Sequence, residues 1–306
     1  MAETKFSHKS SGEPGGNEKD VTADFAFGKV SIKDTTFKKF QALVYREAGI
    51  SLGPTKKSLL VGRLMKRLRA LQLSSFDDYY DHVVGQKDRS ELVQMLNQIC
   101  TNETSFFRHP SHFEFIRDRI LPTLVQDAEK RNRAPRLRAW SAGCSSGEEP
   151  ASLAMTFLDA LPTEPKWDVR VLATDLSTKA LDKAKEFLWP VEKASQIPAD
   201  MLKKFMLRGV DKQIGKMRVG PQARAIIDFQ RLNLNSDTYP SDQNGFDIIM
   251  CRNVLIYFDT ESRMRVVNGL IDRLAPNGFL FLGSSESLNR VTDRVRSAGP
   301  TVYQKV

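Results

Sequence analysis

Apolar residues recur at intervals of three and four along the first third of the chain, after a polar start. The runs 36–49, 75–85 and 88–101 follow this spacing, which is typical of helices that bury one face. In the run 52–75, six apolar residues fall within one arc of about 140° when each residue advances by ~100°. They are Leu60, Val61, Leu64, Met65, Leu68 and Leu71. The pattern predicts a small all-helical domain over residues 31–100.

Beyond about residue 120, apolar runs of strand length alternate with helical runs. The strand-like runs are 137–143, 168–175, 246–251, 279–284 and 301–306, and the helical runs are 151–161, 177–188 and 260–274. Such alternation is typical of a parallel sheet with crossover helices. We therefore expect an α/β domain over residues 121–306, joined to the helical domain by a linker over residues 101–120.

Two stretches depart from these regular patterns. Pro190 and Pro198 interrupt the alternation, and the short runs that follow them predict a small antiparallel β-subdomain, inserted at about 190–231. Residues 1–30 are polar and rich in Gly, Ser and Lys. This composition predicts a disordered tail.

Polar residues stand where several of the expected strands end. The run "FDIIMCRNVLIYFD" is apolar on both sides of Arg252 and Asn253, and the small-residue turn "SAGCSSGEEP" and the pair "TD" follow two other strands. The run "NLN" lies ahead of the point where the regular pattern returns. Ligands bind outside the carboxyl ends of parallel strands. The sequence therefore predicts a binding crevice at this edge of the sheet.

The residues of this crevice restrict the class of ligand. The turn has neither a G-x-G-x-x-G fingerprint nor the lysine of a P-loop. Glu148 and Glu149 begin a helix, where acids commonly compensate the helix dipole for ~0.3–1 kcal/mol, but they also suit a ligand with a positively charged end. Asp175, at the end of a strand, is placed to accept the hydroxyls of a ribose. S-adenosyl-L-methionine, an adenosine with a cationic amino-acid tail, meets both demands.

Four motifs occur in one order: "TNETSFFR" (101–108), "WSAGCSSGEEP" (140–150), "ATDLS" (173–177) and "CRNVLIYFD" (251–259). Over residues 33–306 the chain resembles the CheR family, the chemotaxis receptor glutamate O-methyltransferases of bacteria. The resemblance implies a Rossmann-like methyltransferase sheet with an inserted small antiparallel β-subdomain, preceded by a small all-helical N-terminal domain. It also implies S-adenosyl-L-methionine as the methyl donor and S-adenosyl-L-homocysteine as the product.

The resemblance also assigns the site residues. It implies cofactor contacts by Asn102, Thr104, Arg108, Glu149, Asp175, Asn233, Leu234, Arg252, Asn253 and Val254, with the choice between Glu148 and Glu149 left open. Arg108 and Tyr257 are implied at the point of methyl transfer. A glutamate carboxylate, with an ordinary pKa of about 4.3, is already ionised at neutral pH. The reaction therefore needs no general base, which agrees with motifs that contain no histidine. No metal is implied.

Charge narrows the expected partners. The net charge is +9 and the pI about 9.4, which favours nucleic acid, an anionic membrane surface or an acidic protein face. No acidic residue occurs between residues 52 and 75, so the helix expected there has a face of one sign. The residues of this basic face are Lys56, Arg63, Lys66, Arg67 and Arg69. A solvated helix face is the plainer interpretation of such residues, but acids at i, i+4 that would pair with them are missing.

The family resemblance implies that this face docks on the cytoplasmic helical bundle of transmembrane chemoreceptors. In some family members the β-subdomain also holds a receptor's C-terminal pentapeptide. We expect a cytoplasmic monomer that is recruited to membrane receptors. Direct membrane insertion is not expected, because no run approaches the ~20 apolar residues of a spanning helix. The alternatives are a nucleic-acid methyltransferase and a signalling adaptor on the same fold. No nucleic-acid partner is expected, because an Asn-Pro-Pro-Tyr type turn is absent.

Overall fold

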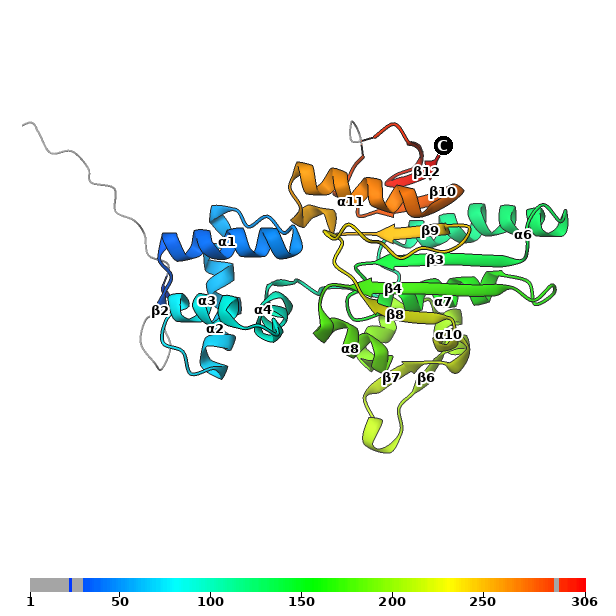
Figure 1. Ribbon diagram of the computed structural model, residues 1–306. Helices are drawn as coiled ribbons and strands as arrows, with labels where there is room; N and C mark the ends of the chain where they lie inside the picture. The colour runs from blue at the N-terminus through cyan, green and yellow to red at the C-terminus, as the bar shows by residue number, and fades with distance from the viewer. Residues whose placement is uncertain (1–21, 24–29, 289–291) are drawn as a thin grey trace, which may run out of the picture.

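The computed structural model describes residues 22–23, 30–288 and 292–306, arranged as a helical domain beside a sheet domain (Figure 1). Most of the expected disordered tail over residues 1–30 lies outside the described residues. Its described residues are Thr22, Ala23 and Val30: Thr22–Ala23 (β1) pairs antiparallel with Val30–Ser31 (β2). Among the described residues, none of the helices combines the length and the apolar character that a membrane crossing requires.

The helical domain forms because four amphipathic helices bury their apolar faces against one another. The elements are α1 (Asp34–Ala48), η1 (Pro54–Lys56), α2 (Lys57–Ala70), α3 (Phe76–Gly85) and α4 (Ser90–Ile99). Five residues of the arc predicted on α2 are buried in the core of this domain, and Leu71 packs against it half-buried. Ser75 caps α3 by accepting the Asp78 N–H at 3.1 Å, as side chains of this type do at helix N-termini.

The sheet domain is built on seven strands in the order β11-β12-β10-β9-β3-β4-β8. They are β3 (Arg136–Ala142), β4 (Asp168–Asp175), β8 (Ile227–Arg231), β9 (Phe246–Cys251), β10 (Leu274–Leu282), β11 (Val295–Gly299) and β12 (Val302–Lys305). The five strands from β10 to β8 are parallel, and β12 and β11 are antiparallel to their neighbours. This sheet confirms the predicted Rossmann-like arrangement.

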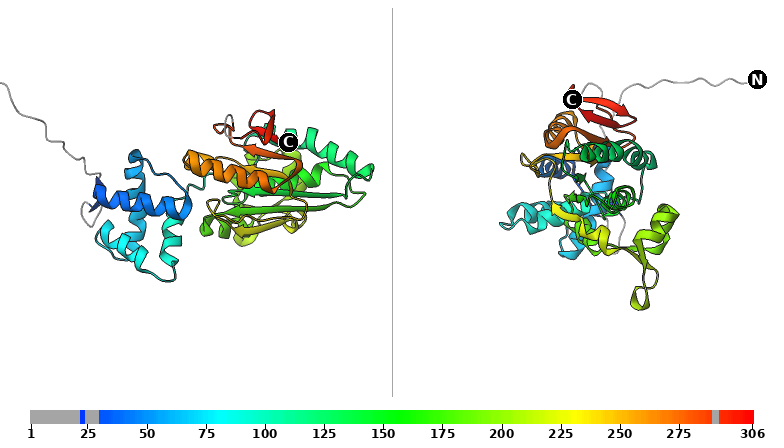
Figure 2. Two further views of the ribbon diagram at one scale, coloured as in Figure 1. Left: turned by 45° about the horizontal axis from the view of Figure 1, so that its top comes forward. Right: turned by 90° about the vertical axis from the view of Figure 1, so that its right-hand side faces the viewer.

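Helices cover both faces of the sheet (Figure 2). Successive side chains of a strand point to opposite faces. Accordingly, Ile248 and Met250 of β9 join one core, and Ile249 and Cys251 join another. The first core includes α7 (Glu148–Ala160), and the second includes α11 (Thr260–Arg273). Ser177 caps α8 (Thr178–Glu186), as its sequence suggests. All five parallel strands end at the same edge of the sheet, which creates the crevice edge.

The inserted β-subdomain is smaller than the predicted 190–231. Its three antiparallel strands are β5 (Leu188–Pro190), β6 (Met206–Arg208) and β7 (Lys216–Val219), with η3 (Val191–Gln196), α9 (Ala199–Phe205) and η4 (Asp211–Gln213) between them. After α10 (Pro221–Ala225), β8 leaves the insertion and pairs parallel with β4, from Val171↔Ile227 to Asp175↔Arg231. The predicted bounds of the β-subdomain included β8 because the partner of a strand is set by long-range pairing, which local sequence patterns do not encode.

The expected linker over residues 101–120 is also shorter in the structure. Residues 101–109 are extended or in turns, and a helical run then continues through α5 (Pro110–Phe115), η2 (Ile116–Ile120) and α6 (Leu121–Glu129). Phe113, Ile116 and Ile120 are at most 5% exposed within the core of the sheet domain. Their burial makes this helical run part of that domain.

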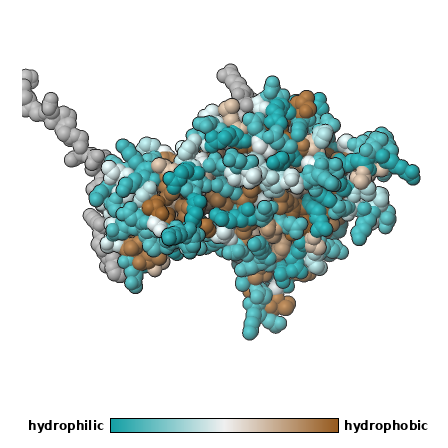
Figure 3. All heavy atoms as spheres, viewed as in Figure 1, coloured by the Kyte–Doolittle hydropathy of each residue, from teal (hydrophilic) through white to brown (hydrophobic). Residues whose placement is uncertain are grey.

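Two sets of contacts join the domains. The Asn97 amide of α4 donates to the Thr178 hydroxyl at 2.8 Å. On the other side, the Ser51 N–H donates to the Tyr257 carbonyl at 2.8 Å, and Ile50 forms a bridge with Phe258. Between these contacts the surface is hollowed, and apolar side chains gather there (Figure 3).

Candidate functional site

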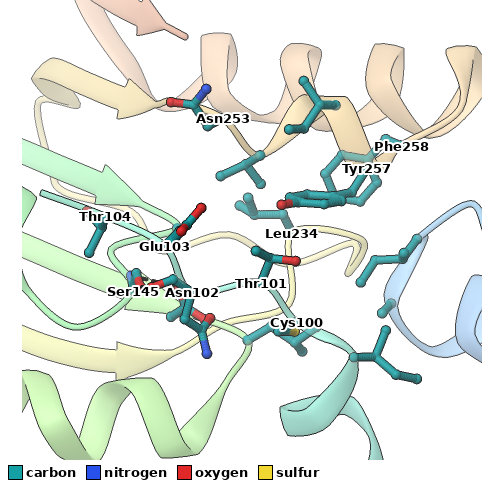
Figure 4. Close-up of a pocket in the computed structure, with 18 of the residues that line it drawn as sticks. Cys100, Thr101, Asn102, Glu103, Thr104, Ser145, Leu234, Asn253, Tyr257 and Phe258 are labelled. Carbon is teal, nitrogen blue, oxygen red and sulfur yellow. Dashed lines mark hydrogen bonds between the residues drawn. The ribbon is translucent and has the colours of Figure 1, made fainter. Parts of the chain in front are cut away.

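A cavity of about 580 Å³ lies between the helical domain and the carboxyl edge of the sheet (Figure 4). This volume is in the range of small-molecule sites. The eleven residues assigned from the motifs all line it: Asn102, Thr104, Arg108, Glu149, Asp175, Asn233, Leu234, Arg252, Asn253, Val254 and Tyr257. The fold thus brings together side chains from the four motifs and from the run "NLN", most of them at the ends of parallel strands.

The turn after β3 forms the base of the cavity. The N–H groups of Gly143 and Cys144 both donate to the Thr174 carbonyl at 2.8 Å. Gly143 has φ +95°, and a Cβ there would lie 2.5 Å from the Cγ2 of Val254. Only glycine fits both conditions. Its missing side chain allows the turn after β9 to pack directly on the turn after β3.

Asp175 is held at the end of β4 by two backbone donors. Its Oδ1 accepts the Ser177 N–H and its Oδ2 accepts the Ser145 N–H, both at 2.8 Å. Burial raises the pKa of Asp175, and these two hydrogen bonds oppose the rise. A carboxylate has about four acceptor sites. The carboxylate therefore keeps acceptor capacity for hydroxyl groups of a ligand.

The two adjacent acids at the start of α7 face different surroundings. Glu149 lines the cavity and accepts the Ser141 hydroxyl at 2.6 Å. Glu148 is fully buried, pairs with Lys193 and accepts the Ser146 hydroxyl at 2.7 Å. Of the two carboxylates, Glu149 is therefore the one at the cavity wall.

Arg252 sits between the cavity wall and the linker. It is 6% exposed, and its Nε donates to the Glu149 Oε2 at 2.7 Å. Its Nη1 donates to the Arg108 carbonyl, and its guanidinium lies over the Phe113 ring, 5.3 Å from the centroid. The charge of Glu149 is thus compensated, so the acids do not make this end of the site simply negative. The pair offers a carboxylate and a guanidinium side by side, which suits a zwitterionic amino-acid end.

The linker residues are fixed by contacts to the sheet domain. The Ser145 hydroxyl donates to the Asn102 carbonyl at 2.8 Å, and the Asn102 amide approaches the Ser177 hydroxyl at 3.4 Å. The Arg108 Nη1 donates to the Glu103 carbonyl at 3.3 Å. The long side chain of Arg108 therefore has one weak contact that a stronger acceptor can replace.

On the opposite wall, the Asn233 amide donates to the Glu47 carbonyl at 2.6 Å, and its oxygen accepts the Asn235 N–H at 3.0 Å. These two bonds fix the orientation of the Asn233 side chain at the cavity wall, beside Leu234. The hydroxyl of Tyr257 points into the cavity (Figure 4).

His112 lies behind Arg252, with Nδ1 at 3.5 Å from the Arg252 Nη1 and Nε2 at 3.0 Å from the Thr301 hydroxyl. Burial, and then the nearby charge of Arg252, lower the pKa of His112 to about 4. The ring is therefore neutral at neutral pH. It does not line the cavity, and within the described ranges no lining residue is a histidine.

The structure divides the expected basic face. Arg67 donates through Nε to the Glu91 Oε1 at 2.8 Å, and Tyr79 donates to the same oxygen at 2.8 Å. Glu91 is 4% exposed and belongs to α4, so the pairing is not visible in the sequence of α2. Arg63 reaches the Thr101 hydroxyl at 2.7 Å and lines the cavity with Lys56. Arg67 and Arg63 are thus engaged inside the protein, whereas Lys56 and Lys66 are exposed.

Some residues at the cavity were not predicted from the sequence. Ser145 and Ser141 lie inside the motif of residues 140–150. No local sequence pattern shows which serines of such a small-residue turn form hydrogen bonds at the site. The segment 50–52 lines the cavity although it lies far away in sequence. In the part of the chain that the structure describes, no group of three or more His, Cys, Asp or Glu residues could hold a metal ion.

Comparison with known proteins identifies the family of this chain. The family model "CheR methyltransferase, SAM binding domain" matches residues 102–304, and "CheR methyltransferase, all-alpha domain" matches residues 35–100. A chemotaxis protein methyltransferase 2 of Pseudomonas aeruginosa is 38% identical, covering 87% of this chain and 91% of that protein. The chemotaxis protein methyltransferase of Escherichia coli is 34% identical, covering 90% and 92%. The chain belongs to the CheR methyltransferase family, whose catalytic domain binds S-adenosylmethionine.

Proposed function

We propose that this protein transfers a methyl group from S-adenosylmethionine to glutamate side chains of bacterial chemoreceptors, forming methyl esters in sensory adaptation. The observation that carries the proposal is the cavity that all eleven expected site residues line. The names of the relatives, chemotaxis protein methyltransferases, support a receptor substrate. The family match does not favour a nucleic-acid methyltransferase or an adaptor.

The residues of the cavity fit the cofactor part by part. Asp175 has acceptor sites left for the ribose hydroxyls, and the Glu149–Arg252 pair suits the ammonium and carboxylate of the amino-acid end. Leu234 and the backbone of Asn233 would flank the adenine. When bound, S-adenosylmethionine supplies a methyl group on a positively charged sulfur.

The chain's own residues would align the substrate carboxylate rather than activate it. A glutamate is ionised at neutral pH, so no base is needed. Arg108 would orient the carboxylate through its guanidinium, and Tyr257 would donate its hydroxyl to one oxygen. A hydrated carboxylate is a weak nucleophile, so exclusion of water by the cavity walls in the substrate complex would favour attack. The contact with Arg108 must stay moderate, because the carboxylate loses its charge as the ester forms.

Two surfaces suit the receptor. Lys56 of η1, which lines the cavity, and Lys66 of α2 are exposed. Both would face the acidic helices of a receptor bundle in the cytoplasm. The hairpin of β6 and β7 protrudes from the sheet domain (Figure 1) and exposes apolar residues: Leu207 at 53%, Val210 at 70% and Ile214 at 77%. Such a hairpin supports a second contact with a receptor pentapeptide.

The decisive experiment is transfer of labelled methyl from S-adenosylmethionine to receptor-bearing membranes. We expect label on the receptor that mild alkali releases, because esters are hydrolysed under conditions that methylated bases resist. Label on nucleic acid, or no transfer at all, would contradict the proposal.

Charge reversal tests the docking surface. We expect Lys66→Glu to slow receptor methylation by roughly 3- to 10-fold at low salt, because a reversed rim charge repels an acidic partner. Added salt should reduce the difference. The rate is measured on receptor membranes, and affinity for S-adenosylhomocysteine by calorimetry should not change.

Lys38→Glu, the same charge change at an exposed site of α1, is the matched control. Arg67 is unsuitable for this test, because its loss would leave the buried Glu91 carboxylate without its ion pair and destabilise the fold. Equal rates for Lys66→Glu and Lys38→Glu would remove α2 from the receptor interface.

A further inference from the structure

Glu286 is a buried carboxylate outside the cavity and outside the four motifs. It follows β10 in the run "GSSES" and is 6% exposed. β10 pairs parallel with β9, and their last residues, Leu282 and Cys251, are partners. The turns after these strands are therefore neighbours, and Glu286 lies between them.

The carboxylate of Glu286 binds three backbone N–H groups. Its Oε2 accepts from Gly283 at 2.6 Å and from Asn253 at 2.8 Å, and its Oε1 accepts from Ile256 at 3.3 Å. Two of these donors, Asn253 and Ile256, belong to the turn that follows β9. Asn253, Ile256 and the adjoining Tyr257 line the cavity, whereas Glu286 does not.

The turn after β9 needs an external acceptor of this kind. Asn253 has φ +59°, a left-handed conformation that non-glycine residues adopt infrequently. Leu255–Tyr257 (η5) is a single 3₁₀ turn, too short to satisfy its own first N–H groups. A buried N–H without an acceptor is costly, so one carboxylate stabilises both the unusual Asn253 and the start of the Tyr257 turn.

Gly283 makes room for this arrangement. A Cβ at that position would lie 2.7 Å from the Glu286 Oε2 and 2.8 Å from the Asn253 nitrogen. Both distances are shorter than real Cβ contacts allow, and one of the atoms belongs to the backbone. A side chain at Gly283 would therefore push the carboxylate and the turn apart.

We propose that Glu286 is a positioning residue for methyl transfer: it fixes the turn after β9, and through Ile256 it fixes the direction of the Tyr257 hydroxyl. The inference rests on the proposed role of Tyr257. It adds a residue that contacts neither cofactor nor substrate but sets the geometry of a group that does. Alignment errors of this kind lower turnover more than binding.

Glu286→Gln tests this with almost no change of shape. The amide oxygen can still accept from Gly283 and Asn253, but the NH₂ group then faces the Ile256 N–H, donor against donor. We expect kcat for receptor methylation to fall roughly 10-fold, with affinity for S-adenosylhomocysteine within about twofold of the original. Glu261→Gln, the same change at an exposed residue of α11, should keep the original rate.

A double-mutant cycle separates positioning from a general structural effect. If Glu286 acts through Tyr257, Glu286→Gln costs little further rate once Tyr257→Phe has removed the hydroxyl. Three results would each overturn the inference. They are an equal loss of rate in the original protein and in Tyr257→Phe, an unchanged rate in Glu286→Gln, and a loss of affinity in proportion to the loss of rate. A normal rate in Tyr257→Phe alone would instead remove Tyr257 from the proposed mechanism, so the two failures are distinguishable.

Gly283→Ala covers the case in which Glu286→Gln does not fold. It keeps the carboxylate and displaces it by the Cβ contacts above. Because this Cβ also presses on the Asn253 nitrogen, at an expected cofactor contact, some loss of affinity is expected as well. A fall in kcat that exceeds the fall in affinity supports the inference. Equal falls, or a normal rate in folded Gly283→Ala, checked by thermal melting, contradict it.

Discussion

Arg108→Ala is expected to lower kcat for receptor methylation by about 100- to 1,000-fold, while affinity for S-adenosylhomocysteine falls far less. In the structure the Arg108 side chain reaches the cavity, with a single 3.3 Å bond to the Glu103 carbonyl. Its guanidinium is thus available to a substrate carboxylate, and its removal takes away alignment rather than the cofactor site. Methylation rates on receptor membranes and calorimetry on the same preparation measure the two effects separately.

Arg108→Lys sharpens the test, because lysine keeps the charge but not the planar pair of donors. A bidentate role predicts that lysine restores only a small part of the rate. Arg119→Ala, at an exposed residue of η2, controls for the loss of a surface arginine and should keep the original rate. If affinity falls as much as the rate in Arg108→Ala, Arg108 serves only in cofactor binding.

Asp175→Ala is expected to weaken S-adenosylhomocysteine binding on the order of 100-fold, because hydrogen bonds to a charged group contribute about 1.5–3 kcal/mol each. The carboxylate also holds the Ser145 and Ser177 N–H groups, so part of the loss comes from the two turns that shape the cavity. Calorimetry measures the effect. Asp228→Ala, at an exposed residue of the neighbouring β8, is the matched control.

The pKa of Asp175 gives a second readout on the same residue. Burial raises this pKa, and only the ionised form accepts hydroxyl groups at all its free positions. Cofactor affinity should therefore fall as the pH is lowered, and the fall should begin above the ordinary aspartate pKa of about 3.9. Asp175→Asn should bind weakly without this pH dependence. A pH profile that is identical in the two proteins would exclude Asp175 as the titrating group.

The residues that the motifs single out line one cavity because the strand ends of a parallel sheet meet at one edge. Arg252, Asn253 and Asp175 stand out in the sequence as polar residues directly after apolar strands, and the fold brings them to one cavity. The choice between Glu148 and Glu149 could not be made in this way. It depends on which partner, Lys193 or Arg252, reaches each carboxylate, and both partners lie more than 40 residues away.

The charge pairing on helix α2 also depended on residues that are distant in the sequence. The interval of apolar residues gave the buried face of α2 correctly, because it depends only on the geometry of a single helix. The state of its arginines was not predictable, since Glu91 approaches Arg67 from α4. A helix face that is purely basic in sequence is thus partly neutralised in the fold.

By itself the sequence determined the two domains, the order of helices and strands, and the residues that would line one cavity, since these follow from local periodicity and from motif order. Only the tertiary structure decided that β8 belongs to the main sheet, that Arg252 compensates Glu149, and that Glu286 holds the turn of Asn253 and Tyr257. Each of these depends on pairings between distant segments, whose partners are selected by the packing of the whole domain.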